Sequence, residues 1–203
     1  MNSMFMNAFN FNSDSSNWNV SNVTDMSFMF DGASSFNSNI SMWNVGNVTT
    51  MSNMFNMAGL FNSDISNWDV SNVTDMSEMF NAGASVNPIS NFNSDISNWN
   101  VSNVTNMSNM FRSAVSFNSS LSNWDVSSVN DMSSMFSRAS IFNADLSNWN
   151  VSNVTNMVAM FSQASNFNSN ISNWNVSNVV DMSGMFFGTD FFNQDLSGWD
   201  VSN

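Results

Sequence analysis

The sequence predicts an α/β solenoid, a stack of about eight 25-residue coils that each contain a short strand and a short helical or 3₁₀ segment. Two observations lead to this fold class. Tryptophan recurs every 25 residues, with one step of 31, at positions 18, 43, 68, 99, 124, 149, 174 and 199. Within each unit the apolar spacing changes once, from nearly alternate positions to positions three and four apart. Self-similarity at a fixed period is typical of stacked repeats, because one unit cannot bury its apolar face alone.

Aligning the units on tryptophan gives the consensus F-N-x-[DNS]-[IL]-S-x-W-[ND]-V-S-N-V-T-[DN]-M-S-x-M-F-x-x-A-x-x. It assigns residues 1–203 to a single repeat solenoid. The predicted parts are a partial coil over 1–10, coils starting at 11, 36, 61, 92, 117, 142 and 167, and a partial coil over 192–203. The long step reflects an insertion at about 84–91 that holds the only proline, Pro88. A proline between two intact units predicts a loop that bulges from the stack, not a domain boundary.

The two halves of a unit predict different secondary structure. Ile65, Trp68 and Val70 have the L-x-x-L-x-L spacing of a leucine-rich repeat, which favours a short strand. Met76, Met79 and Phe80 are spaced as on one face of a short helix or 3₁₀ turn, and Thr74 is the expected N-cap. We therefore expect a leucine-rich-repeat-like coil whose Phe, Trp, Val and Met residues point inward.

The recurring W-[ND]-V-S-N-V-T-[DN]-M-S-x-M-F resembles the repeats of BspA-type leucine-rich repeat surface proteins, in particular the 25-residue repeat class of mycoplasma lipoproteins. The resemblance covers essentially the whole chain. It implies a solenoid displayed on cell surfaces, with adhesion or the binding of host or matrix molecules as its role. The family has no shared catalytic residues to carry over.

The composition excludes several classes of function. Arg112 and Arg138 are the only basic residues against fifteen Asp and Glu, for a net charge of −13. Nucleic-acid binding needs Lys and Arg for the phosphates, and an anionic membrane surface is disfavoured for the same reason. No apolar run is long enough to insert directly into a membrane, and no signal peptide is apparent. Without His, Cys, Lys or Tyr the usual catalytic bases and nucleophiles are missing, so we expect no enzyme and no cofactor.

The residues on either side of each inward tryptophan point outward and form two columns along the stack. We expect these columns to make a flat, amide-rich binding face, because amides can hydrogen-bond sugar hydroxyls. The alternative is a solvated strand face whose side chains hydrogen-bond to one another up and down the stack. The face consists of Asn67, Asp69, Asn98, Asn100, Asn123, Asp125, Asn148, Asn150, Asn173 and Asn175.

Three other surface chemistries follow from the repeat. Weak calcium binding is one, through the carboxylates of Asp14, Asp64, Asp95, Asp145 and Asp195 and of Asp25, Asp75, Asp131 and Asp181, although no D-x-D-x-D-G loop occurs. Ice binding is disfavoured, since the single Thr column is broken at Asn130 and Val180. N-glycosylation is the third, at sequons starting at Asn19, Asn22, Asn39, Asn47, Asn72, Asn100, Asn103, Asn106, Asn118, Asn150, Asn153, Asn170 and Asn175. For the column that contains Asn72 the alternative is a corner asparagine that caps backbone groups.

The sequence thus predicts a non-catalytic extracellular or cell-surface repeat protein for adhesion or ligand binding. The alternative is a structural extracellular filament of subunits stacked head to tail and coated with sugar. The expected partners are other copies of the chain, further repeats of a longer chain, or a host, matrix or glycan ligand. Neither end has the polar cap with which solenoids usually close, which fits either a longer array or head-to-tail stacking.

Overall fold

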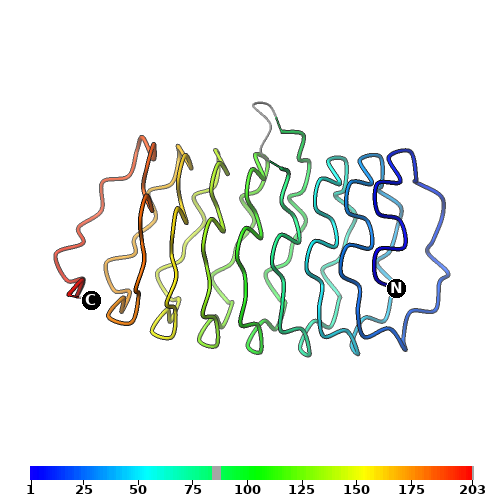
Figure 1. Cartoon of the computed structure of the whole chain (residues 1–203), viewed down its shortest axis with the longest axis horizontal. Helices are drawn as coiled ribbons and strands as arrows, with labels where there is room; N and C mark the ends of the chain where they lie inside the picture. The colour runs from blue at the N-terminus through cyan, green and yellow to red at the C-terminus, as the bar shows by residue number, and fades with distance from the viewer. Residues whose placement is uncertain (84–87, 203) are drawn as a thin grey trace.

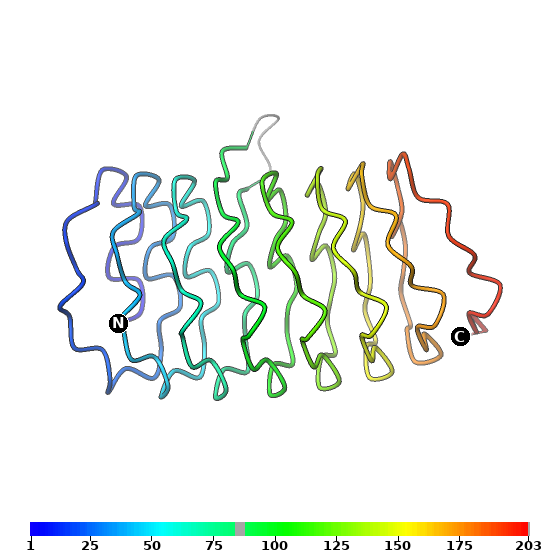
Figure 2. The same ribbon diagram turned by 180° about the vertical axis from the view of Figure 1, so that it is seen from behind.

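The chain winds into a row of similar coils that lie side by side along one axis. The computed structural model describes residues 1–83 and 88–202. Figure 1 shows the coils following one another in sequence order from the N-terminus to the C-terminus, which lie at opposite ends of the row. The view from behind in Figure 2 shows the same order, so each coil contacts the coils that precede and follow it in sequence. The array therefore grows along one direction and has a single continuous interior.

The predicted α/β fold of strand-plus-helix coils is wrong. The described residues contain no helix, and their only β-structure is isolated parallel bridges from one coil to the next. The bridges join Asp25 to Thr50, Thr50 to Asp75, Asp75 to Asn106, Asn106 to Asp131, Asp131 to Asn156, and Asn156 to Asp181. All other described segments are turns, a bend or irregular backbone.

The expected helix is replaced by consecutive turns. The backbone N–H groups of Met79 and Asn81 donate to the carbonyls three residues earlier, each at 3.2 Å. Those of Met76, Glu78 and Phe80 donate instead to the next coil, at 2.9–3.0 Å. An α-helix needs N–H groups directed at the carbonyl four residues earlier, so these bonds exclude one. Thr74 likewise caps no helix, because its N–H and hydroxyl both donate to the Thr49 carbonyl of the preceding coil.

Left-handed backbone residues produce this pattern. Glu78 has a φ of 57°, and the same position is left-handed in seven other coils, at Ser3, Phe28, Asn53, Asn109, Ser134, Ala159 and Gly184. Such a conformation costs a non-glycine residue about 1–2 kcal/mol, because Cβ approaches the following carbonyl. Here it redirects every second N–H toward the next coil, where hydrogen bonds offset the cost.

The expected strand is a turn as well. The Trp68 backbone N–H donates to the Ile65 carbonyl at 3.1 Å, which closes a turn over the residues assigned to the strand. Side chains, not a backbone ladder, connect the coils on this side. The indole N–H of each tryptophan from Trp43 onward donates to a carbonyl of the preceding coil at 2.9–3.1 Å.

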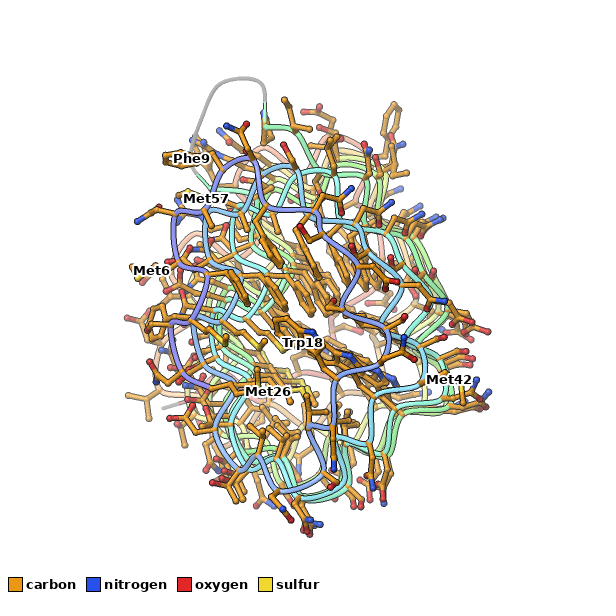
Figure 3. The ribbon with its side chains drawn as sticks, turned by 90° about the vertical axis from the view of Figure 1, so that its right-hand side faces the viewer. Met6, Phe9, Trp18, Met26, Met42 and Met57 are labelled. Carbon is orange, nitrogen blue, oxygen red and sulfur yellow. The ribbon has the colours of Figure 1, made fainter. Side chains whose placement is uncertain are left out.

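Stacked aromatic rings fill the interior. A Phe ring near the end of each coil lies 3.7–4.1 Å, between centroids, from the Phe ring that opens the next coil, as in the pair Phe111 and Phe117. Six pairs of tryptophan rings from successive coils stack at 6.0–6.5 Å. Figure 3 looks along the array and shows Trp18 and Met26 inside the coil, with Met42, Met6 and Phe9 at its outer edge. The Phe, Trp, Val and Met columns predicted to face inward are therefore the core, and each fully buried side chain contributes about 1.5–3 kcal/mol.

The insertion leaves the stack continuous. Residues 84–87 lie outside the described part of the chain, so the predicted loop at 84–91 is described only from Pro88 onward. The Asn91 N–H donates to the Gly59 carbonyl at 3.0 Å, which rejoins the chain to the preceding coil. The Phe61 and Phe92 rings on either side of the insertion then stack at 6.0 Å, like those of any other pair of neighbouring coils.

Candidate functional site

All ten residues of the predicted binding face are exposed. They lie in two columns that flank the buried tryptophans, one residue of each column per coil. Met42 occupies the position that precedes tryptophan and is 83 % exposed. Figure 3 shows it on the outside of the coil, on the side opposite Met6 and Phe9. The structure thus places the predicted face residues together on one side of the array, but the side chains of the two columns differ in their hydrogen bonding.

The column that follows tryptophan stabilises a turn, and we name it the turn column: Asp69, Asn100, Asp125, Asn150 and Asn175. In each of them Oδ1 accepts the backbone N–H of the residue two positions later, at 3.0–3.2 Å. This Asx turn needs one side-chain oxygen, which Asp and Asn both supply. It explains why the two residues interchange in this column. Only the second polar atom of each side chain remains for a ligand.

The column that precedes tryptophan is free, and we name it the free column: Asn67, Asn98, Asn123, Asn148 and Asn173. In the described part of the chain, none of these five side chains makes a hydrogen bond. Each primary amide therefore offers two N–H donors and a carbonyl acceptor to solvent or to a ligand. Met42 and Gly198 interrupt the column near its two ends.

The acidic columns suggested as calcium ligands are further Asx turns. Oδ1 of Asp64 and of Asp95 accepts the N–H of the serine two positions later, at 2.9 Å in both. The backbone N–H and hydroxyl of Ser97 hold the pKa of Asp95 below its ordinary value, and Ser66 does the same for Asp64. Within residues 1–83 and 88–202, no three His, Cys, Asp or Glu side chains come close enough to hold a metal ion. Asp therefore recurs in these columns because its Oδ1 accepts a backbone N–H and closes a turn, and calcium ligation is not needed to explain it.

The thirteen sequons fall into two groups. In the corner column of Asn47, Asn72, Asn103 and Asn153, the side-chain Nδ2 donates to a carbonyl of the preceding coil at 2.7 Å. Nδ2 is the atom to which a glycan would be attached, so in these four residues the hydrogen bond opposes glycosylation of the folded chain. The remaining nine, at Asn19, Asn22, Asn39, Asn100, Asn106, Asn118, Asn150, Asn170 and Asn175, keep Nδ2 free of hydrogen bonds within the described chain and are exposed or half-buried.

A fourth asparagine column has a role that sequence reasoning missed. In the ladder column of Asn12, Asn37, Asn62, Asn93, Asn118, Asn143 and Asn168, Oδ1 accepts the backbone N–H of the equivalent asparagine on the next coil, at 2.8–3.0 Å. The signal was the absence of Asp at this position in every unit. An amide oxygen supplies this acceptor without charge, whereas carboxylates at this position of every coil would repel one another, which disfavours Asp here.

The described residues contain no helix long and apolar enough to cross a membrane. No curated protein matches the chain. A family model described as a mycoplasma protein of unknown function, DUF285, matches residues 1–91, 87–161 and 140–203. These matches support a mycoplasma-type repeat protein and do not extend to the BspA-type leucine-rich repeat in particular. Because the three tandem matches together span the whole sequence, the chain belongs to this mycoplasma repeat family.

Proposed function

We propose that the chain is a non-catalytic repeat protein of the cell surface or extracellular space that binds a ligand through its free column. The observation that carries this proposal is the row of unengaged amides at Asn67, Asn98, Asn123, Asn148 and Asn173. Asparagines of the turn, corner and ladder columns stabilise the fold through side-chain hydrogen bonds, whereas within the described chain these five make none.

The chemistry of the face favours a neutral, hydroxyl-rich ligand. Amides donate and accept hydrogen bonds without carrying charge, so they match sugar hydroxyls better than phosphates or carboxylates. The net charge of −13 disfavours anionic polymers as well. The buried tryptophan rings next to these amides stack at 6.3–6.5 Å from coil to coil, so the amides recur along the array with one on each coil. A glycan lying along the array would meet one amide per coil.

A glycan array with the purified chain tests this function. We expect binding to neutral, extended oligosaccharides by the wild type and a loss of at least tenfold in the N98A/N123A/N148A variant. The matched control is N91A/N166A, which removes two exposed asparagines from a different position of the coil. Equal binding by both variants, or no glycan bound by the wild type, would contradict the proposed ligand class.

Head-to-tail stacking into a filament is the second candidate, and the direction of the backbone ladder supports it. Among residues 1–83 and 88–202, the carbonyls of Asn2, Met4 and Met6 at one side of the array accept no backbone hydrogen bond. At the other side, the N–H groups of Met182, Gly184 and Phe186 donate none to a described backbone carbonyl. Between neighbouring coils the equivalent groups pair, as in the bond from Phe28 N–H to the Ser52 carbonyl at 2.9 Å. A further coil, from the same chain or from another copy, would complete the ladder on either side.

Size-exclusion chromatography and electron microscopy of the purified chain separate the two candidates. Fibres whose thickness matches one coil would support stacking between copies. A monodisperse particle near 22.5 kDa at every concentration would exclude it for this chain. Either result leaves the glycan experiment interpretable, because the free column lies along the side of the array.

A further inference from the structure

Two buried polar side chains on neighbouring coils form an incomplete hydrogen-bonded pair. Asp31 and Asn56 each follow the inner phenylalanine of their coil, and each is only 8 % exposed. The Asn56 Nδ2 donates to Asp31 Oδ1 at 2.8 Å. The Asn56 Oδ1 is buried and has no hydrogen-bond partner. A buried carbonyl oxygen without a partner costs about 1–3 kcal/mol, so its presence calls for an explanation.

The explanation lies in the shapes of the two groups. A primary amide presents an N–H donor and a carbonyl acceptor side by side, whereas a carboxylate presents two acceptors. Only one half of the amide can therefore be satisfied by ionised Asp31. A protonated carboxyl presents one acceptor and one O–H donor, and it complements both halves of the amide at once.

We propose that Asp31 takes up a proton in the folded chain and forms a closed carboxyl–amide pair with Asn56, a clasp that ties two neighbouring coils together. The proton comes from solvent and binds Asp31 Oδ2, whose O–H then donates to Asn56 Oδ1. Asp31 Oδ1 keeps the hydrogen bond from Asn56 Nδ2. No further reactant is needed, and the partnerless oxygen is satisfied. This pH-sensitive contact is independent of the ligand face.

The surroundings of Asp31 favour the neutral form. Burial raises the pKa of Asp31, the Asn56 N–H opposes that change, and the negative charge of Glu78 raises the pKa further. Glu78 is two coils away along the array, and its Oε2 accepts a hydrogen bond from Asn81 at 3.1 Å. On the preceding coil the uncharged Asn7 lies against Gly32, next to Asp31. The charged group that acts on Asp31 is therefore an anion.

The sign of the effect follows from linkage. Because the pKa of Asp31 is raised by folding, protonation stabilises the fold. That stability is fully present below the pKa of the unfolded chain and is lost as the pH rises through the folded-state pKa. The exposed Asp95 behaves in the opposite way, since its pKa is lowered in the folded chain.

The D31N variant tests the clasp, because asparagine at this position imitates the protonated acid in shape and in donor–acceptor pattern. We expect D31N to melt at the same temperature as the wild type in acid and at a higher temperature at neutral and mildly alkaline pH. The matched control D95N changes an exposed carboxyl and should show no stabilisation at neutral pH. A carbon-13 NMR titration of Asp31 in the wild type should give a pKa above that of Asp95.

Three outcomes would overturn the proposal. D31N could be less stable than the wild type at neutral pH, or Asp31 could titrate at or below Asp95. Alternatively, calcium could raise the melting temperature of the wild type and not of D31N, which would make the pair a cation site.

Discussion

The interior and the exterior of each coil repeat with the same period, but they repeat for different reasons. Inside, Phe111 stacks on the equivalent Phe80 and Phe136, Trp124 stacks on the equivalent Trp149, and both side chains are almost completely buried. Outside, asparagine recurs in several columns, and the same side chain does different work in each. Asn103 donates to the preceding coil, Asn93 accepts from the next one, and Asn98 bonds to neither. A residue that recurs inside the coil therefore indicates packing. A polar residue that recurs outside indicates a binding surface only where its side-chain atoms are not already hydrogen-bonded within the array.

The largest effect is expected from the interior, in the F111A variant. Phe111 is fully buried between the rings of Phe80 and Phe136, at 5.7 and 5.6 Å between centroids. Its truncation should lower the free energy of unfolding by about 3–5 kcal/mol, through lost burial and the cavity left behind. Urea denaturation followed by tryptophan fluorescence measures it. A loss below about 1 kcal/mol would mean that the aromatic stack does not stabilise the array.

A smaller loss is expected from W124F, which keeps an aromatic ring and removes its N–H. The Trp124 indole N–H donates to the Ile96 carbonyl at 3.0 Å, inside the core. Leaving that carbonyl unpaired should cost about 1–3 kcal/mol in the same denaturation experiment. W199F is the matched control, because its hydrogen bond is only partly buried, and it should lose less. Equal losses in the two variants would contradict a role for burial.

On the exterior, N103A and N98A should separate two asparagines that are both exposed. N103A removes the bond from Nδ2 to the Ser71 carbonyl at 2.7 Å and should cost about 1 kcal/mol. N98A removes no bond and should stay within about 0.5 kcal/mol of the wild type. Thermal melts of both variants measure the difference. The comparison fails if N98A is as destabilised as N103A.

The smallest effect concerns pH and the exposed Asx turns. The pKa of Asp95 lies below its ordinary value of 3.8, because Ser97 donates its backbone N–H and hydroxyl to the carboxylate. The associated stability is present above the unfolded pKa and is lost as the pH falls through the folded one. D95N keeps the oxygen that accepts the Ser97 N–H, so its melting temperature should fall less on acidification. A steeper fall in D95N than in the wild type would contradict this account.

The repeat period and the inward-facing residues could be predicted from the sequence, because stacking of the coils requires the same apolar residue at the same position of every coil. The backbone between them was not predictable from the spacing. Met76, Met79 and Phe80 are three and four apart, as in a helix, but consecutive turns with a left-handed residue give the same inward spacing. That residue is Glu78 in one coil and Phe28 or Ala159 in others, and these residue types give no local signal of a left-handed turn. Glycine occupies the position only at Gly184.

The candidate site was predictable in part for a similar reason. Alternation around tryptophan placed Asn98 and Asn100 on the surface, where the structure also has them. The division between them depends on the turn at Ser102, whose N–H bonds to Asn100 and leaves Asn98 without a partner. Such a division follows from backbone geometry that the residue types alone do not specify.

The most direct test of this division is an NMR measurement of hydrogen exchange at the side-chain amides. We expect slowed exchange at the corner amides of Asn72 and Asn103, which donate to a neighbouring coil. We expect rapid exchange, as in a free asparagine, at Asn98, Asn123 and Asn148. Equal exchange rates in the two columns would contradict the claim that one holds the array together while the other is left free to bind.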